Sequence, residues 1–288
     1  MPMKASVMTR VFWECYRWPG RTFNYTLVQI LKRISRCGYE CADLCEYPLE
    51  FWPLDLDEED AARLREMTGS LGLEVSGITV PTFSLGLELL PAKEDRVIIA
   101  ERLKRAIELV SYLKGKTVMY GVCPREIYGS TREETYEWTL KLFAECASLA
   151  EDRDVDIAVE FVNTCFPTTQ SIIEFLDRVR SENVGVCLEV SNLNARPREE
   201  TVMEHLEMCG DRIRLVHLVD PARTEWLKSI GVDLLEVVGA LKDAGYDGHL
   251  VVEGWARHVP CSNLDAEVTR AARFLKKALT GLPCSISV

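Results

Sequence analysis

Apolar residues along the chain follow two alternating spacings. Short and nearly continuous apolar runs are typical of parallel strands that are covered on both faces. Each run leads into a longer segment with a different spacing. The runs predict eight strands, at Ala5–Phe12, Tyr39–Leu44, Leu73–Thr79, Lys116–Gly121, Val155–Val162, Val184–Val190, Ile213–Val219 and Gly248–Glu253.

The longer segments place apolar residues three or four positions apart, which predicts amphipathic helices. In one of them, Val97 and Ile98 are predicted to share a buried face with Val110. The predicted helices are Tyr25–Arg36, Asp57–Leu71, Glu94–Leu113, Thr131–Ala150, Thr169–Arg180, Arg198–Cys209, Leu234–Ala244 and Asp265–Leu279.

Eight strand–helix units in 288 residues match a closed α/β barrel. The competing architecture is a doubly wound open sheet, which usually carries a glycine-rich phosphate loop after its first strand. Here the first run leads into WECYRWPGRTFN, which has no such motif. We therefore predict one (β/α)8 TIM-barrel domain that spans residues 1–288.

Composition limits the class of protein, its partners and its expected location. Hydrophobic residues make up 47% and charged residues 27% of the chain, which is globular composition. The net charge of −11 disfavours nucleic acid as a partner. No apolar run is long enough to span a membrane, and the first residues lack the apolar stretch of a secretion signal, so we expect a cytoplasmic protein. The 11 cysteines form no C-x-x-C pair and are interpreted as reduced, buried thiols.

The last four predicted strands each carry a metal-binding side chain near their carboxyl end. These side chains are Glu160, Glu189, His217 and Glu253. Each lies between apolar neighbours, where a charged group must be paired or bound to a metal. Taken singly, a salt-bridged glutamate or a hydrogen-bonded core histidine would account for each of them.

The spacing of the four residues favours a shared site. They are separated by 29, 28 and 36 residues, which is about one strand–helix repeat each. The carboxyl ends of the strands form the active face of TIM barrels, and three carboxylates gathered there would repel one another without a cation. We predict one divalent metal ion, with Mn²⁺ expected first and Mg²⁺, Co²⁺ or Zn²⁺ also compatible with this ligand set.

At this point the chain resembles the xylose isomerase-like TIM-barrel superfamily, the sugar phosphate isomerases and epimerases. The resemblance covers essentially the whole chain and is strongest in IAVEFVN, NVGVCLEVSNLN, RIRLVHLVD and AGYDGHLVVE. It implies a sugar or polyol substrate and a homodimer or homotetramer. Family members usually bind the metal through Glu, Asp, His and Glu. Glu189 replaces the usual Asp, and Asn192 replaces a histidine that often contacts substrate.

The resemblance also implies the catalytic roles. Glu160 and Glu253 would be the acid/base pair that removes and returns a proton at a carbon α to a carbonyl, through an enediolate. Return to the opposite face gives epimerisation, and return to the neighbouring carbon gives isomerisation. Asn192, Arg223 and Trp255 are the candidate substrate-binding residues, whereas His249 is interpreted as unrelated to the site.

Three other functions compete with an isomerase or epimerase. A metal-dependent dehydratase acting on an inosose or dehydroshikimate would also begin with proton removal α to a carbonyl. A DNA-repair enzyme resembling endonuclease IV needs many more histidines than the four present, and the net charge disfavours it. A non-catalytic barrel, used as a binding protein or a subunit, would not need an intact ligand set.

Overall fold

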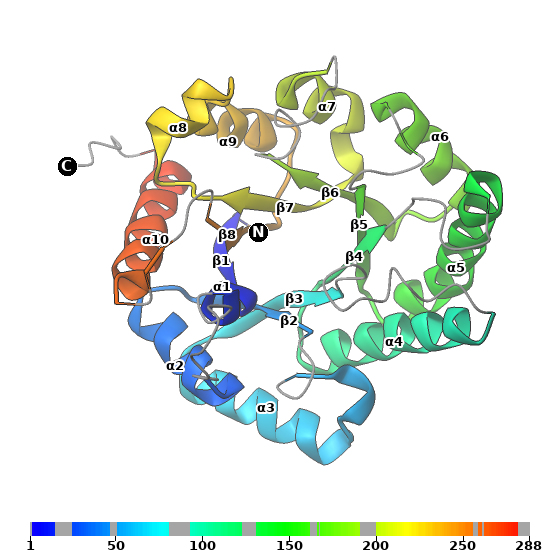
Figure 1. The fold of residues 1–288 in the computed structure, drawn as a ribbon, viewed down its shortest axis with the longest axis horizontal. Helices are drawn as coiled ribbons and strands as arrows, with labels where there is room; N and C mark the ends of the chain where they lie inside the picture. The colour runs from blue at the N-terminus through cyan, green and yellow to red at the C-terminus, as the bar shows by residue number, and fades with distance from the viewer. Residues whose placement is uncertain are drawn as a thin grey trace.

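Eight parallel strands form a closed barrel in the computed structural model, and each strand is hydrogen-bonded to the next, with β8 returning to β1. The strands lie at the centre of Figure 1 and the helices surround them. The predicted TIM barrel is confirmed. The structure describes residues 2–14, 25–46, 51–80, 93–122, 131–161, 166, 168–190, 200–255, 259–260 and 262–281. The strands are β1 (Lys4–Met8), β2 (Cys41–Cys45), β3 (Glu74–Val80), β4 (Thr117–Val122), β5 (Asp156–Phe161), β6 (Val184–Glu189), β7 (Ile213–Val219) and β8 (His249–Gly254).

The outer layer of helices follows the predicted segments closely. Several of these helices begin with a capping box, in which Thr or Asp accepts from the third backbone N–H and the third side chain accepts from the cap. In the described residues, no helix is both long and apolar enough to cross a membrane. The α-helices are α1 (Arg10–Glu14), α2 (Leu27–Arg36), α3 (Glu58–Ser70), α4 (Lys93–Tyr112), α5 (Arg132–Asp152), α6 (Thr169–Val179), α7 (Val202–Cys209), α8 (Thr224–Ser229), α9 (Leu234–Asp243) and α10 (Leu264–Thr280).

The strands are buried because one face of each points into the packed interior of the barrel and the helices cover the other face. All six residues of β6 are buried, which explains its unbroken apolar sequence. The register between β6 and β7 shifts after Val186, and this shift sets Glu189 directly opposite His217. A local irregularity in the barrel therefore aligns two of the predicted metal donors.

The predicted buried face of α4 was partly wrong. Val97 and Ile98 are 62% and 46% exposed, although Val110 is fully buried as expected. The buried face of α4 instead includes Arg102, whose guanidinium forms an ion pair with Glu46, the residue that follows β2. A charged residue belongs to the core here because its partner is buried with it. The spacing of apolar residues along the sequence does not reveal such a pair.

Two short helices differ from the prediction. The first apolar run was predicted to stay extended to Phe12, but β1 ends at Met8 and α1 begins at Arg10. The turn is held by Thr9, whose backbone N–H donates to Asp43 O and whose Oγ1 accepts from Cys45 N–H. α8 was not predicted, because six residues are too few to show a helical period.

The cysteines of the described segments agree with the interpretation as reduced thiols. Six of them are buried, and none of these six forms a disulfide. They are Cys37, Cys41, Cys45, Cys146, Cys187 and Cys209.

Candidate metal centre

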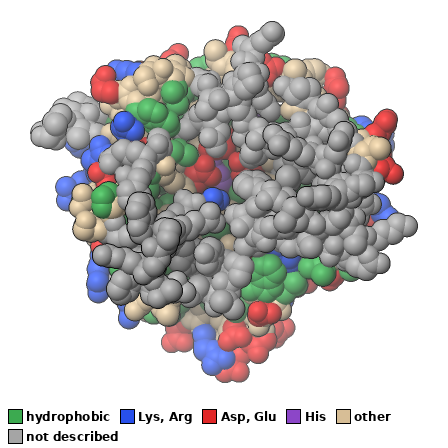
Figure 2. All heavy atoms as spheres, in the orientation of Figure 1, with side chains coloured by type: hydrophobic (Ala, Val, Ile, Leu, Met, Phe, Trp, Pro, Cys, Tyr) green, Lys and Arg blue, Asp and Glu red, His purple; other side chains and the backbone are tan. Residues whose placement is uncertain are grey.

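The four predicted metal donors lie on four adjacent strands, near the carboxyl end of each. Glu160 is in β5, Glu189 ends β6, His217 is in β7 and Glu253 is in β8. Glu160 and Glu189 are each 5% exposed and His217 is fully buried, whereas Glu253 is partly exposed. Figure 2 shows acidic and histidine side chains at the hollow centre of one face, with a Lys or Arg side chain beside them.

Three of the four donors converge on one point. Glu160, His217 and Glu253 each offer one ligand atom, and these atoms lie within 4.8 Å of one another. His217 Nδ1 lies 3.2 Å from Glu253 Oε2. Glu189 lies outside this group of three, although its carboxyl group acts on the pKa of Glu253. Carboxylates gathered in one place repel one another, and a bound cation would relieve that repulsion.

The electrostatics of His217 and Glu253 reflect this crowding. Burial acts to lower the pKa of His217, but the adjacent Glu253 and the charges of Glu160 and Asp43 raise it above the usual value. Burial acts to raise the pKa of Glu253, but His217, the charge of Arg10 and the Glu189 hydrogen bond lower it below the usual value. Glu253 is therefore ionised at neutral pH and lies beside a buried imidazole.

The residues fit a divalent ion. Among the described residues, neither ring nitrogen of the buried His217 has an aligned hydrogen-bond partner. Leaving a buried polar atom unsatisfied typically costs about 1–3 kcal/mol, and a ligand would remove that cost. One imidazole and several carboxylate oxygens form a ligand set that suits Mn²⁺, Co²⁺ or Zn²⁺ and, with its carboxylates, Mg²⁺.

Two side chains near the site were missed by the sequence analysis. Asp43 of β2 is 1% exposed, and its Oδ1 accepts from Thr79 Oγ1 at 2.6 Å. Its position between Ala42 and Leu44 carries the same signal as the four predicted donors, namely a charge inside an apolar run. Arg10 lies in a segment predicted to be extended, and nothing in its local sequence indicates that its charge acts on Glu253.

The candidate substrate-binding residues are placed as follows. Arg223 follows β7 on the rim, where its backbone N–H donates to Asp220 O at 2.9 Å. Trp255 follows β8 directly, and its indole Nε1 is buried with no hydrogen-bond partner in the described part of the chain. Asn192 lies outside the described residues. Asp220 is fully buried in a left-handed conformation with φ of 47°, and its N–H donates to Gly254 O, so the rim segments after β7 and β8 are joined.

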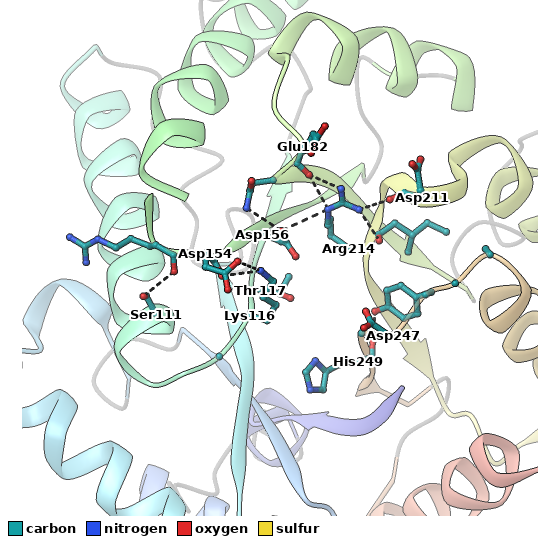
Figure 3. A pocket seen from close by; sticks show the side chains of 18 of the residues that line it. Ser111, Lys116, Thr117, Asp154, Asp156, Glu182, Asp211, Arg214, Asp247 and His249 are labelled. Atoms are coloured by element: carbon teal, nitrogen blue, oxygen red, sulfur yellow. Dashed lines mark hydrogen bonds and ion pairs between the residues drawn. The ribbon is translucent and has the colours of Figure 1, made fainter. Parts of the chain in front are cut away.

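A separate cavity of about 750 Å³ lies at the opposite end of the barrel (Figure 3). His249 lines it, together with the starts of β4 and β5. Several of its charged side chains are held by neighbours: Lys116 forms an ion pair with Asp154 at 2.7 Å, and Arg214 donates to the backbone carbonyl of Glu182 at 2.6 Å. These ion pairs and hydrogen bonds line the cavity at the amino ends of the strands, at the opposite end of the barrel from the candidate metal donors.

Comparison with known proteins places this arrangement in context. The profile of the xylose isomerase-like TIM barrel matches residues 31–278. D-psicose 3-epimerase of Ruminiclostridium cellulolyticum is 22% identical over 242 residues, which cover 79% of this chain and 78% of that protein. The uncharacterized protein MJ1311 of Methanocaldococcus jannaschii is 27% identical over 169 residues, 55% of this chain and 57% of that protein.

The crystal structure of IolI protein with a bound zinc atom has the same fold. It superposes with a TM-score of 0.73 at 18% identity and covers 98% of this chain and 100% of its own.

Proposed function

Because the chain belongs to the xylose isomerase-like TIM-barrel family, we propose that it is a divalent-metal-dependent isomerase or epimerase of a keto-sugar or related polyol. The observation that carries the proposal is the convergence of Glu160, His217 and Glu253 ligand atoms within 4.8 Å at the carboxyl end of the barrel. The relation to D-psicose 3-epimerase supports a sugar as the substrate.

In this proposal, Glu160, Glu189, His217 and Glu253 hold one divalent ion, with Mn²⁺ expected first. The IolI structure, which has the same fold and a bound zinc atom, supports a metal ion in this protein. When bound, the ion would supply Lewis-acid polarisation of a substrate carbonyl. Glu189 would join the group from the end of β6, where it lies directly opposite His217 in the register of the two strands.

The proton chemistry falls to two carboxylates of the same group. His217, Arg10 and Glu189 lower the pKa of Glu253 although burial acts to raise it, so Glu253 is ionised. It can therefore accept a proton from a carbon α to a carbonyl. Glu160 would return a proton to the opposite face of that carbon, which gives the epimer, and the reverse reaction exchanges the two roles. A proton returned to the neighbouring carbon instead would give an aldose–ketose isomer.

Substrate binding is assigned to rim residues. Trp255 offers a buried indole N–H that has no acceptor, so a substrate hydroxyl or carbonyl oxygen would satisfy it. Arg223 offers a guanidinium next to the end of β7. Asn192 stays a prediction, as a neutral residue that donates and accepts hydrogen bonds.

The test follows protons in D₂O. The metal-loaded protein is incubated with D-psicose, D-fructose, an inosose and dehydroshikimate, and the products are followed by NMR. Deuterium α to the carbonyl without loss of water supports the proposal, whereas loss of water assigns a dehydratase. No exchange with any of these compounds contradicts the proposed reaction.

Variants of the two proposed proton-transfer residues, which are also proposed metal ligands, are assayed for both exchange and metal binding. Glu253→Gln and Glu160→Gln should each reduce exchange at least about 100-fold, and Glu66→Gln on the exposed surface of α3 is the matched control. Elemental analysis and Mn²⁺ titration measure binding directly. A wild-type protein that binds no divalent ion contradicts the metal site itself.

A further inference from the structure

The cavity at the amino ends of the strands has the size and the lining of a ligand site. Its volume of about 750 Å³ lies in the range of about 300–1,000 Å³ that is usual for small-molecule sites. Lys116 directly precedes β4, and Asp156 begins β5. Asn183 directly precedes β6, and His249 begins β8. In Figure 3, Lys116, Asp156 and His249 lie around one open space, so several strands bring a polar side chain to the same cavity.

Three of these side chains keep hydrogen-bonding capacity that their neighbours do not use. In the described part of the chain, the Asp156 carboxylate accepts one hydrogen bond, at Oδ1 from Asn183 Nδ2 over 3.4 Å, and its Oδ2 accepts none. The Asn183 amide donates to Val155 O and to Asp156, which leaves its own Oδ1 available as an acceptor. Lys116 Nζ places two hydrogen bonds on Asp154, and an ammonium group has three donors.

The fourth side chain, His249, can both donate and accept. Burial and the positive charge of Lys4 lower the pKa of His249 to about 4, so its imidazole is neutral at neutral pH. A neutral imidazole has one N–H donor and one acceptor nitrogen. Among the described residues, its neighbours act on the ring through their charges and not through hydrogen bonds. Both ring nitrogens are therefore available to a ligand.

The charges around the cavity nearly cancel. Four Lys or Arg residues and five Asp or Glu residues line it, together with the neutral His249. Arg214 donates to the carbonyl oxygens of Glu182 and Asp211 and lies 3.9 Å from Asp156 Oδ1. A lining of such small net charge attracts neither an anion nor a cation strongly, and it favours a ligand that is itself neutral.

The cavity is separate from the candidate metal centre. Asp156 and Glu160 are four residues apart in β5. His249 and Glu253 are likewise four residues apart in β8. Four residues of a strand span about 13 Å, so the buried interior of the barrel lies between the cavity and the metal donors. A ligand in the cavity would not occupy the position of the substrate.

We propose that this cavity is a second ligand site of the protein, and that it binds a small neutral compound with several hydroxyl groups. A hydroxyl group both donates and accepts hydrogen bonds. Hydroxyl groups can therefore donate to Asp156 Oδ2 and Asn183 Oδ1, and they can accept from Lys116 Nζ and from the His249 N–H. This inference does not depend on the proposed reaction, since it concerns the other end of the barrel.

Three matched six-carbon compounds test the chemical class of the ligand. They are sorbitol, which is neutral, gluconate, which carries a carboxylate, and glucamine, which carries an ammonium group. Calorimetry on the Mg²⁺-loaded protein should show that sorbitol binds at least as tightly as either charged compound. Sorbitol binding should persist in His217→Gln, which lacks a metal donor. In amide NMR spectra, sorbitol should shift the signals of Gly115, Gly245 and Gly248, which line the cavity.

Variants test the assigned side chains. Asp156→Asn should weaken sorbitol binding by about 10- to 100-fold, as expected for loss of a charge-assisted hydrogen bond. Lys116→Met, whose side chain is partly exposed, is a second variant that disturbs the core less and should also weaken binding. Asp152→Asn, on the exposed end of α5 and outside the cavity, is the matched control and should bind as wild type does. Urea unfolding of each variant shows that it is folded.

Three results would overturn the inference. The first is that sorbitol does not bind. The second is binding that His217→Gln abolishes and that both folded cavity variants leave unchanged, since it would place the compound at the metal centre. The third is a preference of more than about 10-fold for gluconate or glucamine, which would assign a charged ligand. Deuterium exchange in D₂O, which tests the proposed function, is independent of each of these results.

Discussion

His249 links burial at the amino end of the barrel to the pH dependence of stability. It is the first residue of β8 and lines the cavity in Figure 3, and it pairs in register with Lys4 at the start of β1. Burial and the positive charge of Lys4 lower the pKa of His249 from 6.5 to about 4. We predict that His249→Gln makes the folded protein less sensitive to acid.

The sign and size follow from proton linkage. The unfolded chain binds a proton at His249 near pH 6.5, whereas the folded chain binds it only near pH 4. Above pH 6.5, His249 is neutral in both states and costs no unfolding free energy. As the pH falls from 6.5 toward 4, the unfolded chain binds the proton and the folded chain does not, so the unfolding free energy decreases. The separation between the two pKa values corresponds to about 3 kcal/mol of unfolding free energy.

Urea unfolding at a series of pH values from 7.5 to 4 measures this effect. Over that range the wild-type protein should lose about 3 kcal/mol more unfolding free energy than His249→Gln. Lys4→Met should fall between the two, because loss of the Lys4 charge raises the pKa of His249. Parallel pH profiles for wild type and His249→Gln would refute the reasoning.

Three further predictions concern packing, ion pairing and metal binding. Gly77→Ala should destabilise the protein by about 3 kcal/mol, because its Cβ would lie 2.3 Å from a backbone oxygen of β4. Gly239→Ala in α9 places its Cβ in open space and should stabilise the protein by about 0.5–1 kcal/mol. The midpoint of urea unfolding should therefore fall for the first variant and rise for the second, and a shift in the same direction for both would contradict this account of their packing. Arg102→Met should lower the unfolding free energy by about 3–5 kcal/mol, because it leaves the buried Glu46 carboxylate without its partner. Adding Glu46→Leu should recover part of the loss. A double-mutant cycle measures the interaction, and simply additive effects would contradict the ion pair. Mn²⁺ at 100 times its Kd should raise the unfolding free energy by about 2.7 kcal/mol, a gain that His217→Gln should lose in thermal melts.

The strand and helix pattern was predictable because it is local. The run Ile213–Val219 is β7 without change, and the other strands differ from their predicted bounds by a few residues. Strands covered on both faces are apolar throughout, so their positions are visible in one sequence. The errors fall at β1, in α4 and at α8, which was too short to predict. At β1, Thr9 ends the strand through bonds to β2, and in α4 a buried ion pair interrupts the apolar stripe.

The candidate metal donors could be identified in the sequence for a related reason. A charge inside an apolar strand is costly unless it has a partner, so Glu160, His217 and Glu253 stand out in the sequence alone. Asp43 carries the same signal in the apolar run of β2. Arg223 and Trp255 were found as rim residues, but their sequence positions gave no sign of the buried, unsatisfied Trp255 indole N–H.

The closed barrel and the strand ends that carry the candidate metal donors can be predicted from the sequence alone, because repeat length and burial pattern are properties of single segments. Which donors converge depends on the folded structure. The register shift after Val186 aligns Glu189 with His217, and three ligand atoms, but not Glu189, come within 4.8 Å. Closure of the barrel between β8 and β1 also brings Arg10 to Glu253 from the far end of the sequence. Electrostatic interactions depend on distance in space, and that distance is set by the closed barrel rather than by the spacing of residues along the chain.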